Sequence, residues 1–237
     1  MILQTRIPYD VTTHPSLPGI KPFAMADWLV QDEAFAGQMA RRDALVTERP
    51  AAVLAMDAGA RPAAEELLGY VLARLGPGYT VGDAVARPDG VTVPLVMGDP
   101  MRTLARLVQE DLVIMERRGE EHVLTAAALC FPASWMLAEK FLRPLTGIHV
   151  PVASYDANIA ARVQRLFDGV QVDKPLWRWN GLRYADPELH QPRSEQDRRP
   201  RPENPRFFRT ERQCLVRLPV SRAVVFSIHT YVVAVGD

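Results

Sequence analysis

Residues 209–235 read RTERQCLVRLPVSRAVVFSIHTYVVAV and predict the structural centre of the chain. The second half of this segment is rich in β-branched and aromatic residues, which favour β-strands. Residues 219–222, PVSR, interrupt the pattern and indicate a turn. The segment therefore predicts a β-hairpin of two strands, 209–218 and 223–235.

Because successive side chains of a strand point to opposite faces, the polar residues of the hairpin are expected to divide between the two faces of the sheet. Arg209, Glu211 and Gln213 share a face of the first strand, and His229 and Tyr231 share a face of the second. A cation beside a carboxylate suits a binding site, but it also suits an ion pair that closes the sheet. The residues leave both readings of Arg209 and Glu211 open. His229, like His122, is expected to be structural or exposed.

A further strand is predicted over residues 176–184, LWRWNGLRY. Arg178 and Asn180 would lie on one of its faces, opposite Trp177 and Trp179. Two polar groups beside two tryptophans are typical of a pocket with apolar walls and polar tips. An exposed edge strand would show the same pattern.

Three helices are predicted in the first half of the chain. Residues 32–46 begin at a capping aspartate, residues 61–75 begin with proline at the first helical position, and residues 99–115 begin at Asp99-Pro100. Within the third, residues 109–111, QED, are interpreted as a solvated face or as ion-pair partners of Arg102 and Arg106. Short strands or an extended loop are expected over 77–97, and a buried strand over 122–131. Helices followed by a sheet assembled late in the chain indicate the α+β class.

Residues 132–151, PASWMLAEKFLRPLTGIHVP, connect these parts. They predict a helix capped by Ser134 and ended by Pro144. The chain then places His149 between Ile148 and Val150, in an apolar setting. Such a position suits a metal or haem ligand, and it is also where ordinary core histidines lie.

Composition excludes several functions. The chain has 237 residues, 48% of them hydrophobic and 24% charged, and 28 basic residues balance 28 acidic ones, so no global charge attracts nucleic acid or acidic lipid. Cys130 and Cys214 lack the spacing of a zinc or iron–sulfur site. No segment approaches the roughly 18 apolar residues of a membrane span, and the N-terminus lacks a signal-peptide core. We therefore expect a cytoplasmic protein without nucleic-acid or membrane partners.

The expected organisation is a single domain over residues 1–237. Residues 1–25 contain four prolines and predict an irregular N-terminal arm that includes His14. Residues 185–206 are rich in proline and charge, so they predict a surface loop in which His190 is solvated.

The C-terminal residues resemble a known family. The patterns R-x-E-R-Q-x-L-x-R-L-P, from Arg209, and F-x-I-x-T-Y, from Phe226, are similar to the closing signature of the haem-dependent oxidative N-demethylase family. Further matches follow in the family's order: Ala26-Asp27-Trp28, Asp99-Pro100, residues 109–111, residues 132–140 and residues 148–152. The resemblance therefore covers nearly the whole chain. Two departures are Asn180-Gly181, which lacks a second aromatic residue, and Ala153, which stands where a second proline is usual.

This resemblance implies a PAS-like antiparallel sheet with several helices packed around a pocket for haem b. It implies oxygen-dependent removal of a methyl group from a small secondary amine, such as dimethylamine, with formaldehyde as a product. Electrons would come from a separate reductase with flavin and iron–sulfur centres. The sequence agrees in that it contains no GxGxxG, Walker or cysteine-cluster motif of its own.

Site roles follow from the resemblance combined with the residue types. His149 is the expected ligand of the haem iron, with Trp135, Ile148 and Val150 as apolar walls of the cofactor site. The expected catalytic residues are those that could polarise O₂ or hold an ammonium group: Arg209, Glu211, Tyr231, Arg178 and Asn180. Two alternatives remain open, a haem-binding sensor or carrier without turnover and a structural subunit without haem.

Overall fold

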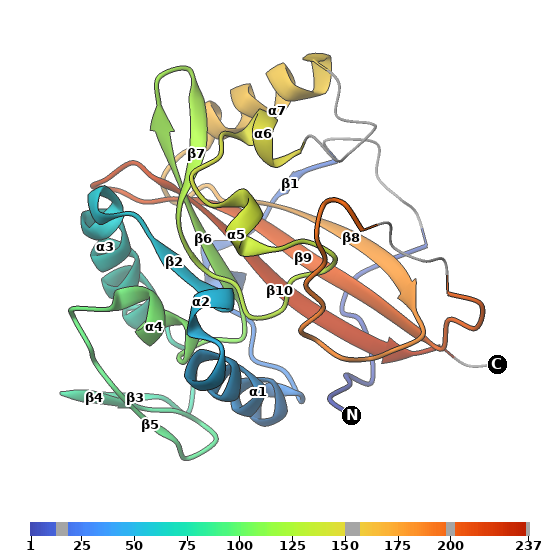
Figure 1. Cartoon of the computed structure of the whole chain (residues 1–237). Helices are drawn as coiled ribbons and strands as arrows, with labels where there is room; N and C mark the ends of the chain where they lie inside the picture. The colour runs from blue at the N-terminus through green and yellow to red at the C-terminus, as the bar shows by residue number, and fades with distance from the viewer. Residues whose placement is uncertain (13–18, 150–156, 198–201, 236–237) are drawn as a thin grey trace.

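The computed structural model describes residues 1–12, 19–149, 157–197 and 202–235. In this part of the chain, two antiparallel sheets combine with several helices, which confirms the α+β class (Figure 1). The larger sheet has the strand order β1 (Lys21–Pro22), β8 (Leu176–Tyr184), β9 (Phe207–Arg217), β10 (Val224–Ala234), β6 (Asp111–Arg118), β7 (Glu121–Ala128) and β2 (Leu54–Met56). The smaller contains β3 (Thr80–Val81), β4 (Ala84–Ala86) and β5 (Thr92–Pro94). The helices are α1 (Phe35–Glu48), α2 (Pro50–Val53), α3 (Arg61–Leu72), α4 (Pro100–Ala105), α5 (Leu137–Lys140), α6 (Leu145–Ile148) and α7 (Ala157–Gly169), with short 3₁₀ turns at Met25–Asp27 and Ala58–Ala60.

The predicted C-terminal hairpin is confirmed and lies at the centre of the larger sheet. β9 and β10 pair without interruption from Arg217 opposite Val224 to Phe207 opposite Ala234. β8 spans the residues predicted for it and pairs with β9, while β6 pairs with β10 on the other side. The candidate site residues of the hairpin, Arg209, Glu211 and Tyr231, therefore lie on inner strands of the larger sheet.

The two faces of this sheet bury different sets of helices. On one face, Leu112, Ile114 and Val225 pack in a cluster with side chains of α1, α3 and α4. On the other face, Val113 and Met115 pack with side chains of α5, α6 and α7. This alternation follows from the two-residue period of strands. Helices α5, α6 and α7 therefore cover one face of the sheet. Adjacent residues of β6, β9 and β10 contact opposite helical layers.

The third predicted helix begins as expected but is wrong beyond Ala105. Asp99 caps α4 by accepting the Arg102 N–H at 3.2 Å, and Pro100 follows. Residues 111–118 form β6 instead of continuing the helix, because they pair with both β10 and β7. A strand buried on both faces reads as a continuous apolar run, so its two-residue period is hidden in the sequence.

The predicted helix from Ser134 to Pro144 is also corrected. Ser134 has a φ of 68°, which is not a helix-cap conformation, and its N–H donates to the Gln191 carbonyl. The segment contains only the four-residue α5, and Pro144 becomes the N-cap of α6 rather than a terminator. The 185–197 loop accepts the Ser134 N–H and β7 accepts the Leu142 N–H, so neither group donates to a carbonyl within one longer helix.

The N-terminal arm extends the sheet locally. β6 pairs with β10 only as far as Ile228, and beyond that point Gln4 occupies the open edge. The Gln4 N–H donates to the Val232 carbonyl at 2.9 Å, and the Gln4 side chain accepts the Val232 N–H at 2.8 Å. The arm thus holds the end of β10 in place.

The described part of the 185–206 loop contains no helix or strand before β9, as predicted. The expectation that His190 is solvated is wrong, because His190 is buried and its Nδ1 lies 2.8 Å from the Cys130 carbonyl. His14 lies outside the described residues. No helix in the described ranges has the length and apolar character needed to cross a membrane.

Candidate functional site

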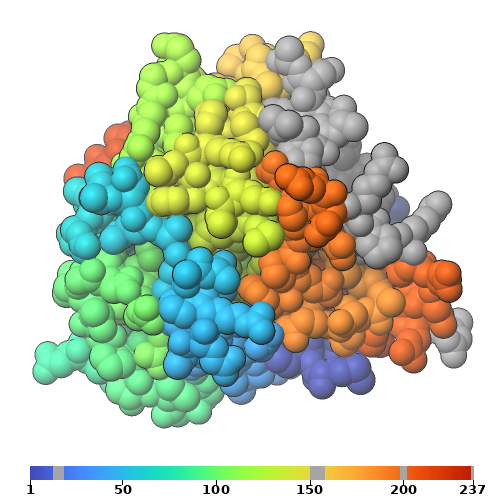
Figure 2. Space-filling model, viewed as in Figure 1, coloured from blue at the N-terminus to red at the C-terminus, as the bar shows by residue number. Residues whose placement is uncertain are grey.

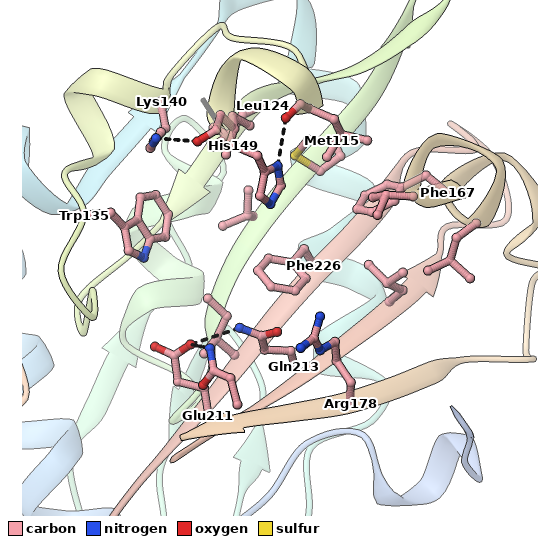
Figure 3. Close-up of a pocket in the computed structure, with 18 of the residues that line it drawn as sticks. Met115, Leu124, Trp135, Lys140, His149, Phe167, Arg178, Glu211, Gln213 and Phe226 are labelled. Carbon is pink, nitrogen blue, oxygen red and sulfur yellow. Dashed lines mark hydrogen bonds between the residues drawn. The ribbon is translucent and has the colours of Figure 1, made fainter. Parts of the chain in front are cut away.

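A cavity of about 510 Å³ lies between the sheet and the layer formed by α5, α6 and α7. Its volume falls within the roughly 300–1,000 Å³ typical of small-molecule and cofactor pockets. Apolar side chains from both layers form much of its wall, among them Met115, Leu124, Leu145, Phe167 and Phe226 (Figure 3). Of the predicted cofactor walls, Trp135 and Ile148 line this cavity, and Val150 lies outside the described residues.

His149 projects into the cavity from the helical layer (Figure 3). It follows α6 directly, and its Nδ1 lies 2.8 Å from the Leu145 carbonyl one turn earlier. Since a carbonyl only accepts, Nδ1 carries the proton, and Nε2 carries the lone pair of the neutral ring. Burial lowers the pKa of His149 below its ordinary value, and the charges of Lys140 and Arg178 act in the same direction. A neutral imidazole with its tautomer fixed in this way suits a metal ligand.

A row of polar side chains faces His149 from the sheet. Arg178 and Asn180 on β8 and Glu211 and Gln213 on β9 all line the cavity, and they pair across the two strands. Figure 3 places Glu211, Gln213 and Arg178 across the cavity from the imidazole. Among the described residues, the cavity therefore has one histidine, on the helical wall, and charged or amide groups on the wall formed by the sheet.

Glu211 is the best-positioned acceptor of this row. It is 4% exposed, and its Oε2 accepts hydrogen bonds from Asn180 Nδ2 and Gln213 Nε2, each at 3.0 Å. Its Oε1 is buried and has no hydrogen-bond partner among the described residues. A buried carboxylate oxygen without a hydrogen bond is costly, and an ammonium group in the cavity could donate one to it.

Arg178 contributes a positive charge that makes no ion pair within the described part of the chain. Its Nε is buried without a hydrogen-bond partner in the described ranges, and burial lowers its pKa. The charge of Glu211 acts against that effect but makes no ion pair with it among the described contacts. A carboxylate entering the cavity would match this guanidinium.

Two of the predicted catalytic residues are placed elsewhere. Arg209 is not among the residues that line the cavity, and it donates to the carbonyls of Leu189, at 2.8 Å, and Phe131, at 2.6 Å. Its Nη2 is 4.0 Å from Glu211 Oε1, so the two charges are neighbours without a hydrogen bond. Tyr231 lies on the opposite sheet face, where its ring packs against Tyr9 at 5.7 Å. The structure therefore does not bring Tyr231 to this cavity.

Sequence reasoning missed five polar residues that line the cavity: Ser134, Lys140, Arg162, Glu195 and Gln213. Gln213 could have been selected, because it follows Glu211 by two positions on one strand face. Lys140 and Glu195 form an ion pair across 55 positions of the chain, and no sequence pattern connects them. Only the course of the loop brings them together.

A second buried polar cluster occupies the other sheet face. His229 Nδ1 lies 3.1 Å from Glu110 Oε1, and its Nε2 lies 3.1 Å from Asp32 Oδ2. Burial acts to lower the pKa of His229, but the two carboxylates outweigh it and raise the pKa to about 9. Both expectations for residues 109–111 are wrong: all three residues are 1% exposed, and Asp111 pairs at 2.7 Å with buried Arg42, while Arg102 and Arg106 pair with other aspartates. This cluster joins helices to the sheet, as expected for a structural histidine.

Fold and site together define a class: an α+β protein with one neutral histidine facing polar groups across an apolar cavity. The chain belongs to the haem-dependent oxidative N-demethylase, alpha subunit-like family, whose model matches residues 19–237. The resemblance found in the sequence is thereby confirmed. The family's description denotes a haem-dependent oxidoreductase, and the words alpha subunit imply an enzyme of several subunits.

Proposed function

We propose that this chain is a haem-binding catalytic subunit that removes a methyl group oxidatively from a small secondary amine, such as dimethylamine. The observation that carries the proposal is the placement of His149 and Glu211 on opposite walls of one cavity. One wall offers a ligand for iron, and the other offers an acceptor for an ammonium group.

The residues of the cavity fit a haem b group. His149 would hold the iron through Nε2, while Trp135 and Ile148 supply apolar wall for the macrocycle. Arg178, whose buried Nε lacks a partner among the described residues, would bind a propionate carboxylate. Bound haem would supply reductive activation of O₂ and oxidation of the N-methyl carbon.

The sheet residues would select and hold the substrate. A secondary amine is protonated near neutral pH, so Glu211 Oε1 would accept one of its N–H groups. Asn180 and Gln213 fix the orientation of the carboxylate by donating to Oε2. Apolar wall such as Phe226 and Ile228 would surround the methyl groups and exclude water.

The overall reaction requires a partner. Dimethylamine, O₂, two electrons and two protons would give methylamine, formaldehyde and water. No nucleotide-binding or iron–sulfur motif occurs in the sequence, so we propose that a separate reductase with flavin and iron–sulfur centres delivers the electrons. The alpha-subunit description of the family supports the proposal that catalysis and electron delivery reside on separate subunits.

The test is the ultraviolet–visible spectrum of the purified protein, oxidised and dithionite-reduced, for wild type and His149→Ala. We expect a Soret band that shifts on reduction, that dimethylamine perturbs, and that is lost or moved in the variant. A wild-type protein with no Soret band after hemin addition would contradict the proposal. A haem protein that binds no amine and yields no formaldehyde with O₂ and a reductant would instead be a sensor or carrier.

A further inference from the structure

Lys140 is a buried cation next to the turn that presents His149. Its side chain is 6% exposed, and its ammonium group donates to the Ile148 carbonyl and to the Glu195 carboxylate. Ile148 immediately precedes His149, so Lys140 holds the peptide group from which the imidazole extends (Figure 3). A buried ammonium is stable only when its hydrogen bonds and charge are matched, and these two acceptors match it.

The imidazole is therefore held from two sides. Leu145 accepts its Nδ1–H, which sets the tautomer and the rotation of the ring. Lys140 sets the position of the backbone at the carboxyl end of α6. A four-residue helix has little rigidity of its own, so contacts from outside must define where His149 points.

The partner of Lys140 comes from the distant 185–197 loop. The Glu139 carboxylate fixes that loop by accepting two hydrogen bonds, one from the Ser194 hydroxyl at 2.6 Å and one from the Glu195 N–H at 2.9 Å. Arg143 Nη1 approaches Glu195 Oε2 at 3.4 Å. In Figure 2 the yellow surface of α5 and α6 adjoins the orange surface of this loop. The loop is thus fastened to α5 at the point where α5 supports His149.

We infer that Lys140 and Glu195 form a positioning pair that orients His149 toward the haem iron and couples the 185–197 loop to that ligand. The inference rests on the proposed function. Lys140 and Glu195 bind no substrate in this account and act through His149. Both also line the cavity, so a movement of the loop would alter the wall and the ligand together.

The test is hemin titration of the apoprotein, with dissociation constants and absorption spectra for Lys140→Met, Lys140→Arg and Glu195→Gln. Outer partners of metal ligands typically change metal affinity by about 10–100-fold, so we expect a loss of that order in Lys140→Met. We also expect its Soret and charge-transfer bands to broaden or shift, since the histidine no longer has one orientation. Lys140→Arg retains the charge and should recover part of both properties.

Lys174→Met is the matched control, because Lys174 is exposed and belongs to neither α5 nor the 185–197 loop. It should bind hemin as the wild type does. In the double variant of Lys140→Met and Glu195→Gln, the losses should be less than the product of the single losses, as expected for one coupled pair. Circular dichroism before titration checks that each variant is folded. If Lys140→Met does not fold, Glu195→Gln alone tests the pair.

The failures of this inference and of the proposed function are distinguishable. If His149→Ala abolishes the wild-type spectrum while Lys140→Met and Glu195→Gln keep wild-type affinity and bands, the inference alone is overturned. A Lys140→Met protein that melts earlier but has unchanged bands would show that Lys140 has a purely structural role, which also overturns it. If His149→Ala binds hemin as the wild type does, the proposed ligand fails and the pair has no ligand to position.

Discussion

At the scale of single residues, the cavity contains two opposite charges whose hydrogen-bonding capacity is incompletely used. Glu211 uses Oε2 for Asn180 and Gln213 and has a buried Oε1 without a partner among the described residues. The Nε of Arg178 is also buried and has no hydrogen-bond partner among the described residues. Proteins usually pair such groups, so exceptions in a cavity mark positions where a ligand completes the pairing. The two residues lead to separate predictions, one for the substrate and one for the cofactor.

The first prediction concerns Glu211. In Glu211→Gln the affinity for dimethylamine should fall roughly 10–100-fold, because hydrogen bonds to charged groups contribute about 1.5–3 kcal/mol. Haem binding should be retained, since Glu211 faces His149 across the cavity and does not hold the cofactor. The measurement is titration of the Soret band with the amine, and Glu203→Gln, an exposed carboxylate, is the control. Equal amine affinities in the variant and the wild type would remove Glu211 from the substrate site.

The second prediction concerns Arg178. Arg178→Met should weaken hemin binding about fivefold, because a partly exposed ion pair contributes on the order of 1 kcal/mol. The band positions should persist, as the iron ligand is untouched. Hemin dissociation constants measure the effect, with the exposed Arg206→Met as control. Arg178→Met with lost amine binding and unchanged hemin affinity would assign Arg178 to the substrate instead.

At the scale of elements, the ion-paired His229 connects β10 to other parts of the chain. It is 1% exposed, Asp32 precedes α1, and Glu110 precedes β6. Burial acts to raise the pKa of Asp32, but its hydrogen bond with His229 and the charge of that ring lower it to about 2. A protonated His229 between two carboxylates therefore stabilises the packing of the first helical layer on the sheet.

The third prediction is a loss of stability at alkaline pH. The pKa of His229 rises from 6.5 in the unfolded chain to about 9 in the folded protein, so the folded state binds the proton more tightly. Its stabilisation is complete below about pH 6.5 and is lost as the pH rises through about 9. The free energy of unfolding from urea titrations should fall over this range in the wild type. His229→Gln should be less stable near neutral pH and should show a smaller decline.

His122→Gln is the control for this pH dependence. His122 is also buried, but burial lowers its pKa, so it does not contribute a loss at alkaline pH. The variant should retain the wild-type decline between about pH 6.5 and 9. An unchanged decline in His229→Gln would mean that other groups cause it.

The elements that sequence patterns predicted well are those whose pattern is local. The hairpin, β8 and the starts of α3 and α4 depend on strand alternation, turn residues and caps within a short stretch, whereas α1 begins at Phe35 and is not capped by Asp32. The errors concern segments defined by distant partners. β6 was read as helix because it is apolar on both faces, and the segment after Ser134 is shaped by the 185–197 loop.

The site divides in the same way. His149, Arg178, Asn180 and Glu211 could be selected because residue type and strand face are visible in the sequence, and all four line the cavity. Residue type alone indicated Tyr231 as a site residue. Phe226 and Ile228 of β10 line the cavity, and Tyr231 lies an odd number of positions from them, so its side chain is on the opposite face of the sheet. Lys140 and Glu195 were missed because their contact exists only after the loop has folded against α5.

At the scale of the whole molecule, the order of strands interleaves the two halves of the chain. The central hairpin comes from the C-terminus, but β2, β6 and β7, which lie between residues 54 and 128, extend the sheet on one side. β1, at residues 21–22, pairs with β8 at the other edge. Gln4 bonds to Val232 near the end of the chain. A division of the sequence at any loop of the large sheet would therefore leave unpaired strand edges.

From this interleaving we predict that residues 1–237 unfold as one cooperative domain. Far-ultraviolet circular dichroism, which follows the backbone, and tryptophan fluorescence should give coincident transitions in urea. The tryptophans sample both layers, because Trp28 is buried with the α1–α4 layer and Trp135 lines the cavity on the other face. Hemin should raise the midpoint of both transitions together, since a ligand of the native state stabilises the whole cooperative unit. Two separate transitions, with hemin shifting only one, would show that the two helical layers unfold independently despite the shared sheet.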